Sequence, residues 1–139
     1  MNKLPAKITA IHQSGTILLV DADVDGQGFS ALMIEASDRP EWLTTGNLVD
    51  LVFKETEVTL AGNLSGKIST RNRLTCRVKN IHKGELLSKV ELQFKQYTLI
   101  SAVTSRAVEA LEIVEGSEVE ALIKANEVSL MKTVSSQYA

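Results

Sequence analysis

The most chemically suggestive part of the sequence is a run of five consecutive side chains that form hydrogen bonds, Ser69, Thr70, Arg71, Asn72 and Arg73. The run lies between a joint at 66–68 and the expected start of a strand at 75–78. Hydroxyl, amide and guanidinium groups donate hydrogen bonds, so the run could hold a small anion if its donors converged. It could equally be a hydrated linker. The elements around the run have to decide between these two interpretations.

The composition narrows the class of protein. The chain has 139 residues, of which 44% are hydrophobic and 23% charged, with a net charge of −2. Broad binding to nucleic acid needs clustered Lys and Arg, so direct nucleic-acid binding is disfavoured. The longest apolar runs, such as 16–20, are too short to cross a bilayer, and the N-terminus lacks the apolar core of a signal peptide. We therefore expect a cytoplasmic protein without a membrane partner.

No sequence motif points to catalysis. The chain lacks a nucleophile elbow, a phosphate-binding loop and paired carboxylates in an identifiable pocket. Its single cysteine, Cys76, alternates with the polar residues Thr75 and Arg77, a pattern that predicts a buried thiol that packs as a small hydrophobe. The prediction is that the chain is not an enzyme.

Two signals for metal binding fail on inspection. The segment 21–28 resembles the start of a calcium loop, but loop position twelve, which must supply a bidentate acid, is Leu32. The flanks have the pattern of strands, so Asp25-Gly26 predicts a hairpin turn. His12 and His82 lie 70 residues apart and predict a structural or solvent-facing role.

The chain contains an internal duplication with an offset of 70 residues. One offset serves both ends of the repeat, so the halves align without a net insertion. The matching pairs are Asn2/Asn72, Leu4/Leu74, Ile11/Ile81, His12/His82, Val20/Val90, Gly46/Gly116, Val49/Val119, Lys54/Lys124, Glu57/Glu127, Val58/Val128 and Leu60/Leu130.

Each repeat has the pattern of a small β-domain. Strands are expected at 6–11, 16–24 and 29–34 and again at 76–81, 86–94 and 99–104, with two short strands closing each repeat within 48–60 and 118–130. The segment 105–117 predicts a short helix with Val108, Leu111 and Ile113 facing inward, whereas Pro40 in 35–47 permits a first helical turn. This pattern predicts an all-β fold of two tandem OB-like five-stranded Greek-key barrels, with domains at 1–63 and 67–134.

Two strings of the second repeat carry a resemblance to a known family. "KISTRNRLTCRVKNIHKG" resembles the opening of molybdate-binding Mop/TOBE domains, which begin with Ser-x-Arg-Asn-x-Leu, and "ALEIVEGSEVEALIKANEVSLM" resembles their closing pattern. The resemblance spans 67–132. The first repeat is more divergent, because Met1 stands where the second repeat has Arg71. The whole chain thus resembles a two-repeat (di-Mop) molybdate-binding protein.

The resemblance implies an oxyanion site at an interface between subunits or repeats, with no metal bound directly by side chains. The implied binding residues are Ser69, Thr70, Arg71, Asn72, Thr104, Ser105 and Lys124. The family has a serine where this chain has Ala107, so one donor is missing. In the first repeat only Lys54 is retained, since Ile34 replaces Thr104, and we expect Lys54 to be at most a secondary contact.

The implied function is cytoplasmic binding of molybdate or tungstate for intracellular storage, homeostasis or delivery, without an organic cofactor. The resemblance also implies a homo-oligomer, with a trimer favoured and a dimer as the alternative. A second hypothesis is a molybdate-sensing regulatory or interaction module that acts through a partner protein. A third and weaker hypothesis is a nucleic-acid-binding OB protein, since OB barrels can bind oligonucleotides.

Overall fold

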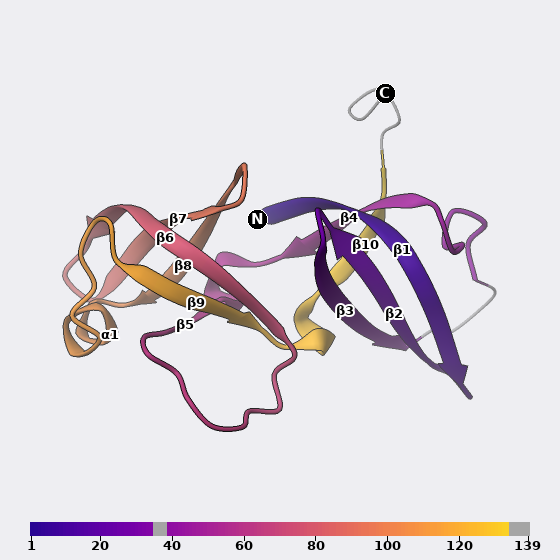
Figure 1. Ribbon diagram of the computed structural model, residues 1–139, viewed down its shortest axis with the longest axis horizontal. Helices are drawn as coiled ribbons and strands as arrows, with labels where there is room; N and C mark the ends of the chain where they lie inside the picture. Colours follow the sequence, from indigo (N-terminus) through magenta and orange to yellow (C-terminus); the bar gives the residue numbers. More distant parts are fainter. Residues whose placement is uncertain (35–38, 134–139) are drawn as a thin grey trace. The chain divides into compact units, whose positions relative to one another are not determined.

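The computed structural model describes residues 1–34 and 39–133, which are built mainly of β-strands with short helical turns (Figure 1), as predicted. In chain order the elements are β1 (Asn2–Ser14), β2 (Ile17–Val24), β3 (Gln27–Ile34), β4 (Leu48–Phe53), η1 (Glu55–Glu57), β5 (Thr59–Ala61), β6 (Asn72–Lys83), β7 (Leu87–Phe94), β8 (Tyr97–Thr104), α1 (Ser105–Ala110), β9 (Glu118–Ile123), η2 (Ala125–Glu127) and β10 (Ser129–Lys132). None of the helices in these residues is long and apolar enough to cross a membrane.

The strands form two five-stranded sheets, which belong to two compact units of the chain. The 3–53 unit comprises Lys3–Phe53 and continues from Ala125, and its sheet has the order β10-β4-β1-β2-β3. The 54–124 unit comprises Lys54–Lys124 together with Met1–Asn2, and its sheet has the order β5-β9-β6-β7-β8. Pairing is antiparallel for β1–β2, β2–β3, β4–β10, β5–β9, β6–β7, β6–β9 and β7–β8. These are the two five-stranded OB-like barrels that the sequence predicts.

The repeats of the sequence do not coincide with the compact units. Strand β5 closes the first repeat in the sequence, yet it pairs with β9, with Thr59 opposite Leu122. Likewise β10 closes the second repeat but pairs with β4, with Ser129 opposite Val52. Each repeat therefore gives its last strand to the unit built mainly from the other repeat. The expected boundaries 1–63 and 67–134 describe the duplication, whereas the compact units change over after Phe53 and after Lys124.

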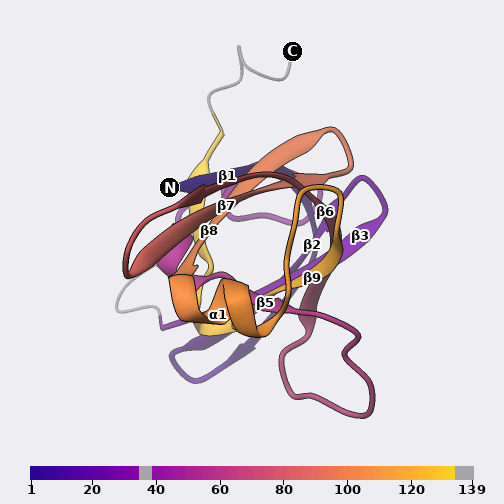
Figure 2. The same cartoon turned by 90° about the vertical axis from the view of Figure 1, so that its left-hand side faces the viewer.

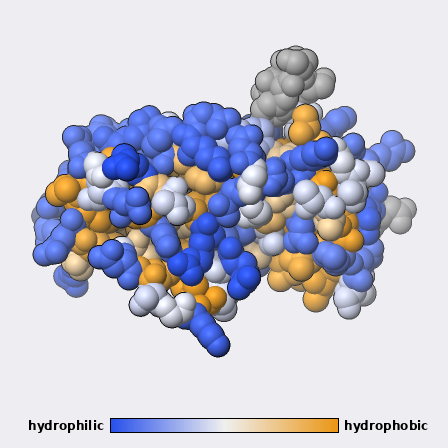
Figure 3. Space-filling model, viewed as in Figure 1, coloured by the Kyte–Doolittle hydropathy of each residue, from blue (hydrophilic) through white to orange (hydrophobic). Residues whose placement is uncertain are grey.

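The core of each unit is mainly aliphatic, with Phe29 and Phe53 buried in one unit and Phe94 in the other, and β6 alternates as predicted. In β6, Leu74, Cys76 and Val78 are buried while Thr75 and Arg77 are exposed. Figure 2 shows the curved strands of the 54–124 unit, with α1 in the foreground. Polar and charged side chains cover much of the face seen in Figure 3, with apolar patches among them. Burying one face of each curved strand is what gives so small a barrel its core.

The segment that resembles a calcium loop is a hairpin turn. Asp25 and Gly26 join β2 to β3 and have φ values of 48° and 90°. Positive φ at both central residues is the signature of a type I′ turn, which Asp-Gly adopts readily. The backbone N–H of Gly26 donates to Asp23 Oδ2 at 3.0 Å, and Leu32 lies within β3. The hairpin prediction is confirmed.

The predicted helix of the second repeat exists but is shorter than its pattern suggests. Helix α1 spans only Ser105–Ala110, and both Val108 and Ile113 are buried as expected. The prediction for Leu111 is wrong: its side chain is 38% exposed, because the helix has ended and Leu111 is its C-cap. In the first repeat Pro40 opens a hydrogen-bonded turn in which the N–H of Leu43 donates to its carbonyl at 3.0 Å. The rest of that prediction, at 35–38, lies outside the described residues.

Candidate anion-binding site

The run of donors forms the lead-in to β6. Ser69 and Arg71 are exposed and Thr70 is half-buried, in an irregular segment that precedes the first strand residue, Asn72. The run is therefore not a free linker, because its last two residues, Asn72 and Arg73, belong to the central strand of the sheet.

Arg71 and Lys124 are the residues that flank the last pair of the β6–β9 ladder. Asn72 pairs with Ile123 and Arg73 with Leu122, so one further step of the same register places Arg71 opposite Lys124. Directly opposed residues in such a pair have their Cβ atoms about 4.5–5.5 Å apart. Both side chains are exposed, and neither forms an ion pair within residues 1–34 and 39–133. Two adjacent positive charges repel each other, and an anion would relieve that repulsion.

Arg73, unlike Arg71, has a carboxylate partner within the sheet. Its Nε and Nη2 atoms donate to Glu120 Oε2 at 3.1 and 2.7 Å, across the same pair of strands. Arg73 is thus neutralised by a carboxylate on β9. Arg71, two residues earlier, has no ion-pair partner in the described residues.

The structural role of Asn72 can be inferred from Asn2, its counterpart in the first repeat. In the 54–124 unit the side chain of Asn2 donates from Nδ2 to the carbonyl of Ile100 and accepts from the N–H of Ile100, both at 2.8 Å. The amide thus imitates one rung of a β-ladder against the edge strand β8. Asn72, 70 residues later, is only 1% exposed and has a partner of its own. Its side chain belongs to the fold, and the part of Asn72 that remains a candidate contact is its backbone.

Thr104 and Ser105 lie at the other end of β6 from Arg71. Thr104 pairs with Leu87, and the next residue, Ser88, pairs with Lys83, the last residue of β6. A cavity of about 380 Å³ lies there, lined by Glu85, Leu86, Thr104, Ser105, Arg106 and Glu109. Within one chain, therefore, Thr104 and Ser105 do not join Arg71 and Lys124.

The two hydroxyl groups of this cavity differ in what they can still donate. Thr104 Oγ1 accepts the N–H of Ala107 at 3.1 Å and caps α1, which leaves its own proton for a ligand. Ser105 is buried: its Oγ donates to the carbonyl of Gly84 at 2.6 Å and bonds Ser88 Oγ at 2.7 Å. These contacts hold the loop before β7, so the structure gives Ser105 a role in the fold.

Arg106 is a neighbour of Thr104 that sequence reasoning missed. It is exposed and supplies a positive charge to the same cavity that Thr104 lines. Two carboxylates, Glu85 and Glu109, line the cavity as well, and Glu109 is held by Lys83 at 2.9 Å. Its place in the sequence, directly after Thr104 and Ser105, is the signal that could have identified Arg106.

The other reactive side chains, those of Cys76 and His12, do not indicate a binding site. Cys76 is 2% exposed, and burial raises the pKa of its thiol to about 12, so the thiol is buried as predicted. His12 Nε2 lies 3.1 Å from Asp21 Oδ2 on the exposed face of the hairpin. No group of three or more His, Cys, Asp or Glu side chains that could hold a metal ion occurs in the described part of the chain.

Comparison with known proteins identifies a related domain family and similar structures. The TOBE domain family matches residues 68–130. A structure of the cytoplasmic molybdate-binding protein ModG, solved with molybdate bound, superposes with a TM-score of 0.89 at 29% identity and covers 95% of this chain and 96% of its own. A molybdate-binding protein from Sporomusa ovata is 40% identical over 48% of this chain and 100% of its own, with a TM-score of 0.47. No curated protein sequence matches the chain. Residues 68–130, which include Arg71 and Lys124, therefore belong to the TOBE domain family, and the chain as a whole is similar in structure to ModG.

Proposed function

We propose that the chain binds molybdate or tungstate and serves the storage, homeostasis or delivery of molybdenum in the cytoplasm. The observation that carries the proposal is that Arg71 and Lys124, which flank the last β6–β9 pair, Asn72 and Ile123, are both exposed and have no carboxylate partner in the described residues. The molybdate-bound ModG structure, which is alike over 95% of the chain, supports the choice of ligand.

The proposed ligands suit a tetrahedral dianion. Arg71 offers a planar fork of N–H donors, and Lys124 offers a compact ammonium. The backbone and hydroxyl groups of Ser69 and Thr70, which directly precede Arg71, offer neutral donors. The oxygen atoms of molybdate are the atoms recognised, so no side chain has to coordinate the metal, and no organic cofactor is required.

We propose that a second copy of the chain completes the site. Arg71 precedes the first residue of β6, whereas Thr104 lies beside the last one, so one barrel cannot bring both to the same anion. A homo-oligomer can, if the Thr104 end of one copy meets the Arg71 end of another. We favour a trimer over a dimer, and native mass spectrometry with and without molybdate measures the number of copies.

We also propose that the chain has no enzymatic activity and needs neither nucleic acid nor membrane. Its one thiol is protonated and buried, and the structural neighbours are molybdate-binding proteins. The alternative in which a partner protein reads the molybdate signal makes a different prediction. A partner retained from the host proteome regardless of molybdate would favour that alternative.

Isothermal titration calorimetry with molybdate, tungstate and sulfate tests the proposal. The proposed site predicts heat with both metal oxyanions and a weaker response to the smaller sulfate. The absence of heat with either metal oxyanion would refute it.

A further inference from the structure

The duplication places different residues after the matching lysines of the two repeats. Lys124 corresponds to Lys54, so each repeat has a lysine just before its 3₁₀ turn. The next residue differs: Ala125 follows Lys124, whereas Glu55 follows Lys54. One repeat thus has a methyl group where the other has a carboxylate.

The carboxylate of Glu55 lies between two cations. Its Oε1 atom is 3.3 Å from Lys89 Nζ, and its Oε2 atom is 3.6 Å from the amino group of Met1. The Glu55 side chain is 23% exposed, whereas that of Lys89 is 56% exposed, so the carboxylate is the more enclosed partner. Each of its oxygens has a cation of its own, the arrangement that a bound oxyanion would adopt.

The fold does not need this carboxylate. Turn η1 is fixed by other contacts: the N–H of Lys54 donates to Glu57 Oε1 at 2.9 Å, and Ser101 Oγ donates to the carbonyl of Val58 at 2.7 Å. Turn η2 has the same 3₁₀ form with Ala125 in the place of Glu55. The structure of the turn therefore does not explain why residue 55 is a glutamate.

From this we infer that Glu55 is a built-in anion that occupies Lys89 and the amino group of Met1 and keeps an oxyanion out of this place in the 54–124 unit. Ala125 leaves the matching turn of the second repeat without such an anion. The choice of ligand in this inference rests on the proposed function.

The substitution Glu55→Gln tests the inference because it removes the charge and keeps the shape. With molybdate as the probe, calorimetry on the full chain should show one additional anion per chain compared with the wild type. Adding Lys89→Met to this variant should abolish the additional binding, because the freed ammonium is lost with it.

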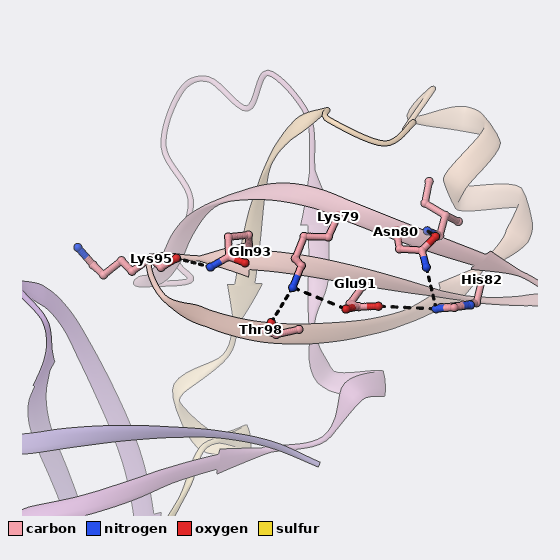
Figure 4. Close-up of polar contacts among 8 residues, drawn as sticks. Lys79, Asn80, His82, Glu91, Gln93, Lys95 and Thr98 are labelled. Carbon is pink, nitrogen blue, oxygen red and sulfur yellow. Dashed lines mark hydrogen bonds and ion pairs between the residues drawn. The ribbon is translucent and has the colours of Figure 1, made fainter. Parts of the chain in front are cut away.

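Glu91→Gln is the matched control. Glu91 also lies between two basic side chains, with Oε1 3.8 Å from Lys79 Nζ and Oε2 3.7 Å from His82 Nε2 (Figure 4). It carries the same charge and has a similar exposure, 30%. Its loss changes the net charge equally but frees no lysine next to a 3₁₀ turn, so the number of bound anions should stay at the wild-type value.

The outcomes separate this inference from the proposed function. Unchanged stoichiometry in Glu55→Gln, with normal binding to the wild type, overturns the inference alone. An equal gain in Glu91→Gln also overturns it, since the effect would then be one of net charge. A wild type that binds no molybdate overturns the proposed function, and the change in stoichiometry from that baseline still decides the role of Glu55.

Discussion

The substitution Arg71→Ala isolates the group on which the proposed site depends most. Arg71 is exposed and has no carboxylate partner in the described residues, so its removal leaves no buried group unsatisfied. Surface substitutions of this kind change the free energy of unfolding by no more than about 0.5 kcal/mol. The unliganded variant should therefore unfold at nearly the wild-type urea concentration.

Binding should respond very differently from stability. A hydrogen bond to a charged group contributes about 1.5–3 kcal/mol. Because about 1.4 kcal/mol corresponds to a tenfold change in affinity, the Kd for molybdate should rise by roughly 10- to 150-fold. Isothermal titration calorimetry gives this change directly, and urea unfolding of the same samples shows whether the fold is intact.

Arg73→Ala is the control for residue type and location. Arg73 lies two residues further along, but its guanidinium is bound to Glu120 at 2.7 Å and is not available to a ligand. Since that pair is partly exposed, its loss should cost about 0.2–1 kcal/mol of stability and change the Kd less than about threefold. Equal losses of affinity in the two variants, or none in Arg71→Ala, would refute the assignment of Arg71.

Three further predictions concern the fold and the second half of the site. Ser101→Ala should lower the free energy of unfolding in urea by about 1–3 kcal/mol, because the carbonyl of Val58 loses its partner; an unchanged midpoint would contradict this. Thr104→Val should weaken molybdate binding in calorimetry by about 2- to 12-fold and cost about 1 kcal/mol for the lost helix cap, while Thr104→Ser should restore both. The thiol of Cys76 has a folded pKa of about 12 against 9.0 when unfolded, so its contribution to stability is complete below pH 9 and is lost as the pH rises toward 12. Between pH 8 and pH 10.5 the free energy of unfolding in urea should fall by about 1–2 kcal/mol more for the wild type than for Cys76→Ala. Equal falls in the two proteins would show that the thiol is not the cause.

The sequence predicts the barrels well because a strand with one buried face alternates apolar and polar residues with a period of two. The alternation around Cys76 and the Asp25-Gly26 turn are local signals, and both predictions hold. Because of the duplication, the pattern of each strand occurs twice in the sequence, so each strand prediction is supported twice. Leu111 was assigned to the wrong face because its spacing fits a helix that ends one residue earlier, at Ala110.

The exchange of the last strands could not be read from the sequence. Strands β5 and β10 occupy matching positions in the duplication, with Leu60 corresponding to Leu130, so the sequence does not distinguish which barrel each strand joins, and only the three-dimensional structure shows it. The same limit applies to the site. Sequence reasoning named Ser105 as a donor without seeing that its hydroxyl is already bonded to Gly84 and Ser88. It also could not see that Arg73 has Glu120 as a partner and Arg71 has none in the described residues.

An X-ray structure of the chain crystallised with molybdate, with anomalous data at the molybdenum edge, tests the central claim most directly. The proposed site predicts an anomalous peak within hydrogen-bonding reach of Arg71 and Lys124, with a Thr104 hydroxyl from another copy on the same anion. A peak only at other positions, or no peak at a saturating concentration of molybdate, would contradict the claim.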